Sequence, residues 1–206
     1  MSETVLNEMD IRERCIPGFL VIIVIADQLR YLEILVHILS GHVDDATRML
    51  NEHFPSVLSG PIVVPPAPSS ESPSLTFRRT DYMPSSSIDP AHLTLNLRIS
   101  SFIEACRTIP LVYPLLHDDT SSAPSSASTE LSPERQLTLL LKAQKLHALI
   151  NALPKASDRA VYHKELNNVG GLLAYKVPET SSISKYLSQE RREAVADQIN
   201  SAILSA

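Results

Sequence analysis

The sequence predicts an all-α protein, a helical bundle interrupted by two disordered Ser/Pro-rich linkers. Apolar residues recur at helical spacing in three separate regions, and no stretch shows the alternating pattern of a strand. The chain has 206 residues, of which 44% are hydrophobic, enough for one compact domain of ordinary size. Its 15 prolines against 5 glycines, with no tryptophan, indicate that extended segments interrupt the core.

The first helical region is predicted from His42 to Phe54. Acidic side chains follow its start, where the helix dipole is positive, and Pro55 ends it. Gly41 separates it from a preceding helix over about Gln28 to Ser40. Its apolar positions at helical spacing are Val43, Ala46, Leu50 and Phe54.

A second amphipathic helix lies between two linkers and is expected to end at about Thr108, before Pro110. The linkers span residues 59–91 and 117–132, and their Ser/Pro-rich composition can neither sustain a helix nor bury enough apolar area to order them. We therefore predict both to be disordered. The helix between them carries one stripe of Leu95, Ile99, Phe102 and Cys106, widened by Leu97 and Ile103.

The third region, residues 133–206, opens with Ser132 as N-cap and Pro133 at the first helical position. Pro154 stops this helix, and Asp158 is expected to cap the next one. The glycine pair at 170–171 is expected to end that second helix in the left-handed conformation. The inward stripes are Leu139, Ala143, Leu146, Ile150 and Leu153, followed by Tyr162, Leu166 and Val169.

Two further helices are predicted at the C-terminal end. A short one lies around Ile183 to Leu187, and the last runs from about Gln189 to Leu204. The last helix is expected to bury Val195, Ile199 and Ala202. Its charged residues are expected to stay in water, namely Arg191, Arg192, Glu193 and Asp197.

Composition excludes several classes of protein. A net charge of -5 and a pI near 5.8 give no basic surface for nucleic acid. The most apolar run, Phe19 to Ala26, is much shorter than the roughly 20 residues that cross a bilayer, so we expect no membrane span. Two cysteines far apart favour a reducing compartment, and the polar start is not a secretory signal. We expect a cytoplasmic or nuclear protein.

No catalytic, metal or cofactor site is predicted. None of the seven histidines stands in a ligand motif, and the Gly170–Gly171 pair lacks the further residues of a phosphate loop. Cys106 lies on an apolar stripe, where a thiol behaves as a small hydrophobe. Ser72 and Ser132 each precede a proline. Proline-directed phosphorylation and the chance occurrence of Ser-Pro pairs in Ser/Pro-rich linkers explain these pairs equally well.

Three strings resemble one family. HILSGHVDDATRMLNEHFPSVL, from His37 to Leu58, resembles the core of a CTLH motif, and LTLNLRISSFIEACRTIPLVYP, from Leu93 to Pro114, resembles its continuation in RanBPM-like proteins. The stretch from Leu139 to Leu204, which begins LLLKAQKLHALINALPK and ends QERREAVADQINSAIL, is similar to a nearly complete CRA domain. The pattern resembles the C-terminal portion of fungal RanBPM-like proteins.

This resemblance implies a helical hairpin scaffold and a non-catalytic subunit of a GID/CTLH-type ubiquitin ligase. Its partners would be other LisH/CTLH/CRA subunits or a second copy, and ubiquitin transfer would belong to RING-type subunits, for which two cysteines are too few. An alternative attached to the same family is a Ran-associated or cytoskeletal adaptor. An enzyme would need a convergent polar pocket, which the scattered His and Cys do not suggest.

The N-terminal part departs from the family pattern. NEMDIRER, from Asn7 to Arg14, looks like the lead-in to the CTLH helix, but residues 15–36 intervene before HILSG. That segment is interpreted as an insertion or a retained intron, and as dispensable, or alternatively as an apolar helix packed on the scaffold.

No LisH motif and no SPRY domain precede the CTLH-like region. In the family, the last CRA helices pack against LisH, so the sequence predicts an apolar face without its usual cover, and self-association or aggregation of the chain alone. The face would be covered by a second copy, by a LisH-containing ligase subunit or by the N-terminal segment if it folds back. The expected interaction residues are Tyr186, Leu187, Val195, Ile199, Ala202 and Ile203.

Overall fold

The computed structural model describes residues 28–59, 83–113 and 132–205, and every regular element within them is helical. This confirms the all-α prediction. A helix over residues 28–39 is followed by the α-helices α2 (Val43–His53), α3 (Pro55–Ser59), α4 (Pro90–Cys106), α5 (Pro133–Asn151) and α6 (Ala156–Gly170). Three short 3-10 helices follow, η2 (Gly171–Ala174), η3 (Pro178–Thr180) and η4 (Ser184–Leu187), before α7 (Gln189–Ser205).

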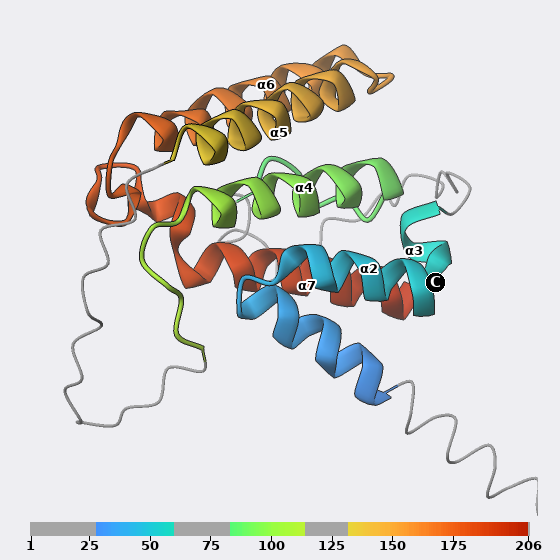
Figure 1. Cartoon of the computed structure of the whole chain (residues 1–206). Helices are drawn as coiled ribbons and strands as arrows, with labels where there is room; N and C mark the ends of the chain where they lie inside the picture. Colours follow the sequence, from blue (N-terminus) through green and yellow to red (C-terminus); the bar gives the residue numbers. More distant parts are fainter. Residues whose placement is uncertain (1–27, 60–82, 114–131, 206) are drawn as a thin grey trace, which may run out of the picture.

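Helix α4 lies at the centre of the fold, with α5 and α6 on one side and α2 and α7 on the other (Figure 1). It contributes to two hydrophobic clusters. The first cluster joins α4 to the helix over residues 28–39, α2, α3, Met83 and α7, and the second joins α4 to α5, α6, η2 and η4. A helix that serves two cores must be apolar on two sides, so one inward stripe could not describe it. Leu97 faces the first cluster, whereas Leu95 and Ile99 face the second.

The predicted first linker, residues 59–91, extends too far at its C-terminal end, because α4 begins before residue 91. Pro90 and Ala91 are already helical, and the Asp89 carboxylate caps the helix by accepting from the Ala91 amide at 2.9 Å. Met83 is buried in the first cluster. Residues 83–91 are therefore ordered by packing, whereas residues 60–82 lie outside the described residues.

The second predicted linker, residues 117–132, lies outside the described residues except for Ser132. The Ser132 hydroxyl accepts from the Arg135 amide at 3.3 Å, and Pro133 occupies the first turn of α5. This confirms the predicted N-cap. At the other end of α4, the helix stops at Cys106, two residues before the predicted limit.

Residues 28–36 form most of a helix that packs into the first cluster. Its side chains Ile34 and Ile38 are fully buried, and the Tyr31 hydroxyl donates to Asn200 Oδ1 on α7 at 2.5 Å. This packing favours the alternative that the sequence left open, an apolar helix on the scaffold, for these residues. Residues 15–27 lie outside the described residues. Gly41, with φ of +81°, turns the chain into α2, which only a residue without Cβ does at low cost.

Two predictions about helix ends in the third region are wrong. Helix α6 begins at Ala156 and its N-cap is Lys155, so Asp158 lies inside the first turn and not at the cap. Gly170 and Gly171 have φ of -59° and -58°, in the right-handed region, because the chain continues directly into η2. Leu172, in η2, packs in the second cluster.

Candidate protein-interaction surface

The interaction face predicted on the last helices is buried within the chain. Leu187, Val195, Ile199 and Ala202 are 6%, 1%, 0% and 5% exposed, while Tyr186 and Ile203 are partly buried against the clusters. The cluster that buries the apolar side of α7 also contains Ile34 and Ile38 of the helix over residues 28–39, Leu50 of α2, Val57 of α3 and Leu97 of α4. The prediction of a face that drives self-association is therefore wrong. Of the covers that the sequence left open, the structure shows the N-terminal segment, in its described residues 28–36, packed into the same cluster.

The two arginines of α7 that were predicted to stay in water are also buried. Arg191 is 3% exposed and its Nη1 lies 2.7 Å from Glu165 Oε1 on α6. Arg192 is 6% exposed and its Nη1 lies 3.1 Å from Glu104 Oε1 on α4. Burial of a guanidinium requires such partners. Both arginines therefore fix α7 to the other helices and are not free to bind a partner protein.

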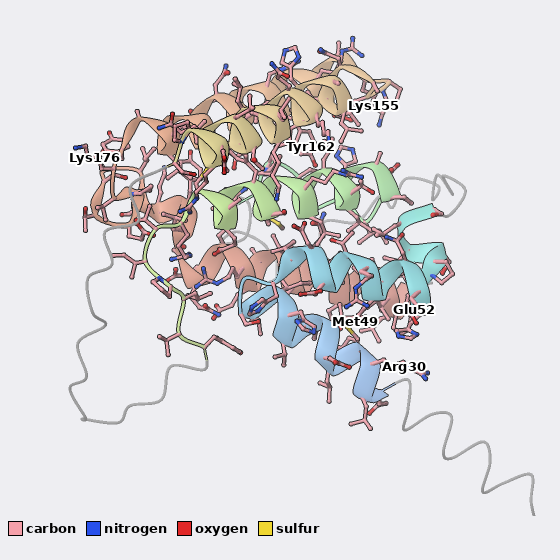
Figure 2. The ribbon with its side chains drawn as sticks, viewed as in Figure 1. Arg30, Met49, Glu52, Lys155, Tyr162 and Lys176 are labelled. Carbon is pink, nitrogen blue, oxygen red and sulfur yellow. The ribbon has the colours of Figure 1, made fainter. Side chains whose placement is uncertain are left out.

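A chain of hydrogen bonds crosses the centre of the molecule. The Tyr162 side chain extends from α6 towards α4 (Figure 2), where its hydroxyl lies 3.0 Å from His92 Nδ1 and donates to Asn96 Oδ1 at 3.2 Å. Asn96 donates in turn to Gln198 Oε1 on α7 at 2.8 Å. At the outer end, His92 Nε2 lies 3.4 Å from an Asp158 carboxylate oxygen.

This network has a structural role. Burial raises the pKa of Tyr162 well above its ordinary value, with a further rise from the Asp158 carboxylate, so its hydroxyl stays protonated.

Burial likewise raises the pKa of Cys106 to about 12, which leaves no thiolate near neutral pH. Within the described residues there is no group of three or more His, Cys, Asp or Glu that could hold a metal ion. Nor is any described helix both long and apolar enough to span a bilayer.

The outer face of α5 carries a stripe of exposed leucines, which we call the α5 stripe. Its residues Leu137, Leu140 and Leu141 are 58%, 50% and 47% exposed, while Leu139, Leu146 and Ile150 on the opposite face are buried. Further along the same exposed side of α5, the residues Gln144 and Ala148 are uncharged. Apolar residues gathered on one face are typical of contact sites, whereas single exposed ones are ordinary.

Beside this stripe, residues of α2, α4 and α5 line a hollow. We call it the α2–α5 groove. It has a volume of about 170 Å3 and is lined by Asp44 of α2, Arg98 and Ser101 of α4, and Lys142, Lys145, Leu146 and Leu149 of α5. A second hollow of about 310 Å3 adjoins it and shares Asp44, Ser101 and Lys142. These three residues form a bridge, in which Ser101 Oγ donates to Asp44 at 2.6 Å and Lys142 Nζ donates to Ser101 Oγ at 3.2 Å.

Sequence reasoning missed both the stripe and the groove. One signal for the stripe was present, because three consecutive leucines from Leu139 to Leu141 cannot all face one core from one helix. No local signal marked the groove. Arg98 and Lys145 come from helices whose packing brings them together, and that packing depends on the second cluster.

The fold and its surfaces describe an all-α interaction module, in which polar groups lock the helices and apolar ones remain exposed on an outer helix. The chain belongs to the family of the CTLH/CRA C-terminal to LisH motif domain, whose model matches residues 29–206. CTLH domains mediate protein–protein interactions, so the partners of this chain are proteins. Among curated proteins and among solved structures, the comparisons find no significant match.

Proposed function

We propose that this protein is a non-catalytic scaffold subunit of a GID/CTLH-type ubiquitin ligase and acts in ubiquitin-dependent protein degradation. Its partners are other LisH/CTLH/CRA subunits, or a second copy, bound through helices. We also propose a cytoplasmic location, which a nuclear pool can accompany. Family membership supports an interaction role, and the resemblance to RanBPM-like proteins supports the ligase assignment.

The observation that carries the proposal is the α5 stripe. Leu137, Leu140 and Leu141 lie on the side of α5 opposite the second cluster, where about half of each residue stays exposed. Covering each leucine would contribute about 1 kcal/mol, given that roughly half of each side chain is already buried. Stabilisation of that size suits a contact with another helix. It offers nothing to a polar small-molecule substrate.

The test is affinity purification of the tagged protein from its native cells, with identification of the chains that co-purify. We expect RING-type and LisH-containing ligase subunits. The variant Leu137→Ser/Leu140→Ser should lose them, because it removes apolar contact area without touching the core. The matched control is Leu204→Ser, which alters a leucine at the end of α7 that is even more exposed.

Recovery of enzymes of small-molecule metabolism in place of ligase subunits would contradict the ligase assignment. Retention of every partner by the Leu137→Ser/Leu140→Ser variant would show that another surface makes the contact.

A further inference from the structure

We propose that the α2–α5 groove is a docking site for an acidic, aliphatic peptide segment of a partner protein. The inference rests on the proposed scaffold function and adds the chemistry of the segment that one of the partners presents. It is carried by a local excess of positive charge at a concave site on a chain whose net charge is -5.

Three cationic side chains line the groove against one carboxylate. Lys142 is already engaged, because its Nζ lies 3.5 Å from the Asp44 carboxylate and 3.2 Å from Ser101 Oγ. Arg98 and Lys145 are exposed, and no described residue forms an ion pair with either. Arg98 and Lys145 line the same hollow, and no acidic side chain among the described residues neutralises either of them. A carboxylate from another chain would form ion pairs with Arg98 and Lys145.

The walls of the groove specify more than charge. Leu146 is buried at its base and Leu149 is partly buried beside it, so the lining combines aliphatic surface with cationic rims. A volume of about 170 Å3 corresponds to that of on the order of six water molecules. One side chain of a peptide fits such a space, and a folded element does not. The occupant is therefore an extended or helical segment that presents Glu or Asp next to a Leu-like side chain.

A peptide suits this groove better than a nucleic acid. The Asp44 carboxylate, with Asp45 and Glu104 in the adjoining hollow, would repel a continuous phosphate backbone. A peptide can place its acidic residues at the cationic end alone. The α5 stripe lies on the outer side of the same helix, so one partner helix or strand could contact both the leucines and Lys145.

Fluorescence anisotropy with the full chain and two labelled peptides tests the proposal directly. One peptide repeats the sequence Glu-Leu-Glu-Glu-Leu, and the other replaces each Glu by Gln. We expect micromolar to submillimolar binding of the acidic peptide that weakens with salt, and at least tenfold weaker binding of the Gln peptide. Arg98→Ala/Lys145→Ala should lose at least tenfold, whereas Asp44→Asn should bind equally well or more tightly.

The control Lys176→Ala removes an exposed lysine between η2 and η3 that does not line the groove (Figure 2), and it should leave binding unchanged. Equal binding of the wild type and the double variant would overturn the proposal, as would tighter binding of a labelled oligouridine than of the acidic peptide. Binding of the acidic peptide by an Asp118→Asn/Asp119→Asn variant, but not by the wild type, would assign the groove to residues of this chain itself and would also overturn the proposal. Because the assay needs no ligase subunit, failure here leaves the co-purification test unaffected.

Discussion

Individual polar residues decide how the helices of this protein hold together, and most of them are not recognisable in the sequence. Arg192 on α7 was expected in water because of its charge, but it lies three residues before Val195 on the buried face of the helix. It reaches Glu104 on α4, which also binds Arg107 at 2.7 Å. The Leu187 carbonyl accepts from both guanidinium groups, at 3.1 and 2.8 Å. Long-range partners of this kind follow from tertiary packing, and helical periodicity contains no information about them.

The Tyr162 hydroxyl connects His92 to Asn96, and Tyr162→Phe removes it while keeping the ring. We expect the free energy of unfolding to fall by about 1–3 kcal/mol, because Asn96 is left with a buried acceptor that has lost its donor. Urea unfolding followed by circular dichroism measures this. Tyr175→Phe, at an exposed tyrosine whose hydroxyl lies 3.3 Å from Ser182 Oγ, should change stability by less than about 0.5 kcal/mol. Equal effects of the two substitutions would show that the central network contributes nothing.

Glu179 on η3 ties the loop before α7 to the end of α4. Burial raises the pKa of its carboxyl, but hydrogen bonds from the Ile109 and Thr108 amides and the Thr108 hydroxyl outweigh this and hold the pKa below its ordinary value of 4.5. The stabilisation is therefore complete above pH 4.5 and is lost as the pH falls through the lower, folded-state pKa.

Replacing Glu179 by Gln should cost on the order of 1 kcal/mol near neutral pH, and the difference from wild type should shrink below pH 4.5. Urea midpoints across that range measure it, with Glu193→Gln, an exposed position, as the control. A difference that stays constant down to pH 3 would mean that the carboxylate charge does not matter.

At the scale of elements, periodicity and capping residues predicted each long helix and the inward stripes of α2, α5, α6 and α7, which are buried, but not the second buried side of α4. Ser132 and Pro133 marked the start of α5 correctly, because an N-cap acts within one turn. Helix α4 was interpreted with one inward stripe, although its neighbours on both sides bury Leu93 and Leu97 as well as Ile99 and Phe102. The residues of the α2–α5 groove come from three helices, so their proximity follows only from the assembled bundle.

The helix over residues 28–39 makes the prediction that belongs to this scale. Ile34→Ala should lower the free energy of unfolding by about 2–5 kcal/mol, because a fully buried aliphatic side chain leaves a cavity beside α7. Val36→Ala, two residues away and exposed, should change it by no more than about 0.5 kcal/mol. Chemical denaturation of both variants measures the contrast. A harmless Ile34→Ala would support the interpretation of residues 28–36 as a dispensable insertion.

At the scale of the whole molecule, α4 connects the two hydrophobic clusters into one structure. Leu97 packs in the first cluster and Ile99 in the second, and the chain between them is a single helix. Neither cluster can lose its α4 face without exposing the other, so both should unfold in one transition. Helix α7 belongs to this unit because Ile199 is fully buried in the first cluster and Arg192 is paired with α4.

We therefore expect Ile199→Asp to unfold the chain and not merely to weaken its self-association. A carboxylate at this position has no cationic partner in the apolar cluster, and the desolvation of an unpaired charge costs more than the few kcal/mol by which a domain of this size is stable. The far-UV circular dichroism of the variant should lose most of its helical signal, and amide hydrogen exchange in α5 and α6 should accelerate together with that in α7. Leu204→Asp, at a position that is 77% exposed on the same helix, should keep both signals. The opposite result would be an Ile199→Asp chain that remains helical and sediments as a smaller species than wild type. That result would mean that the apolar face of α7 is an interface between chains, as the sequence predicted.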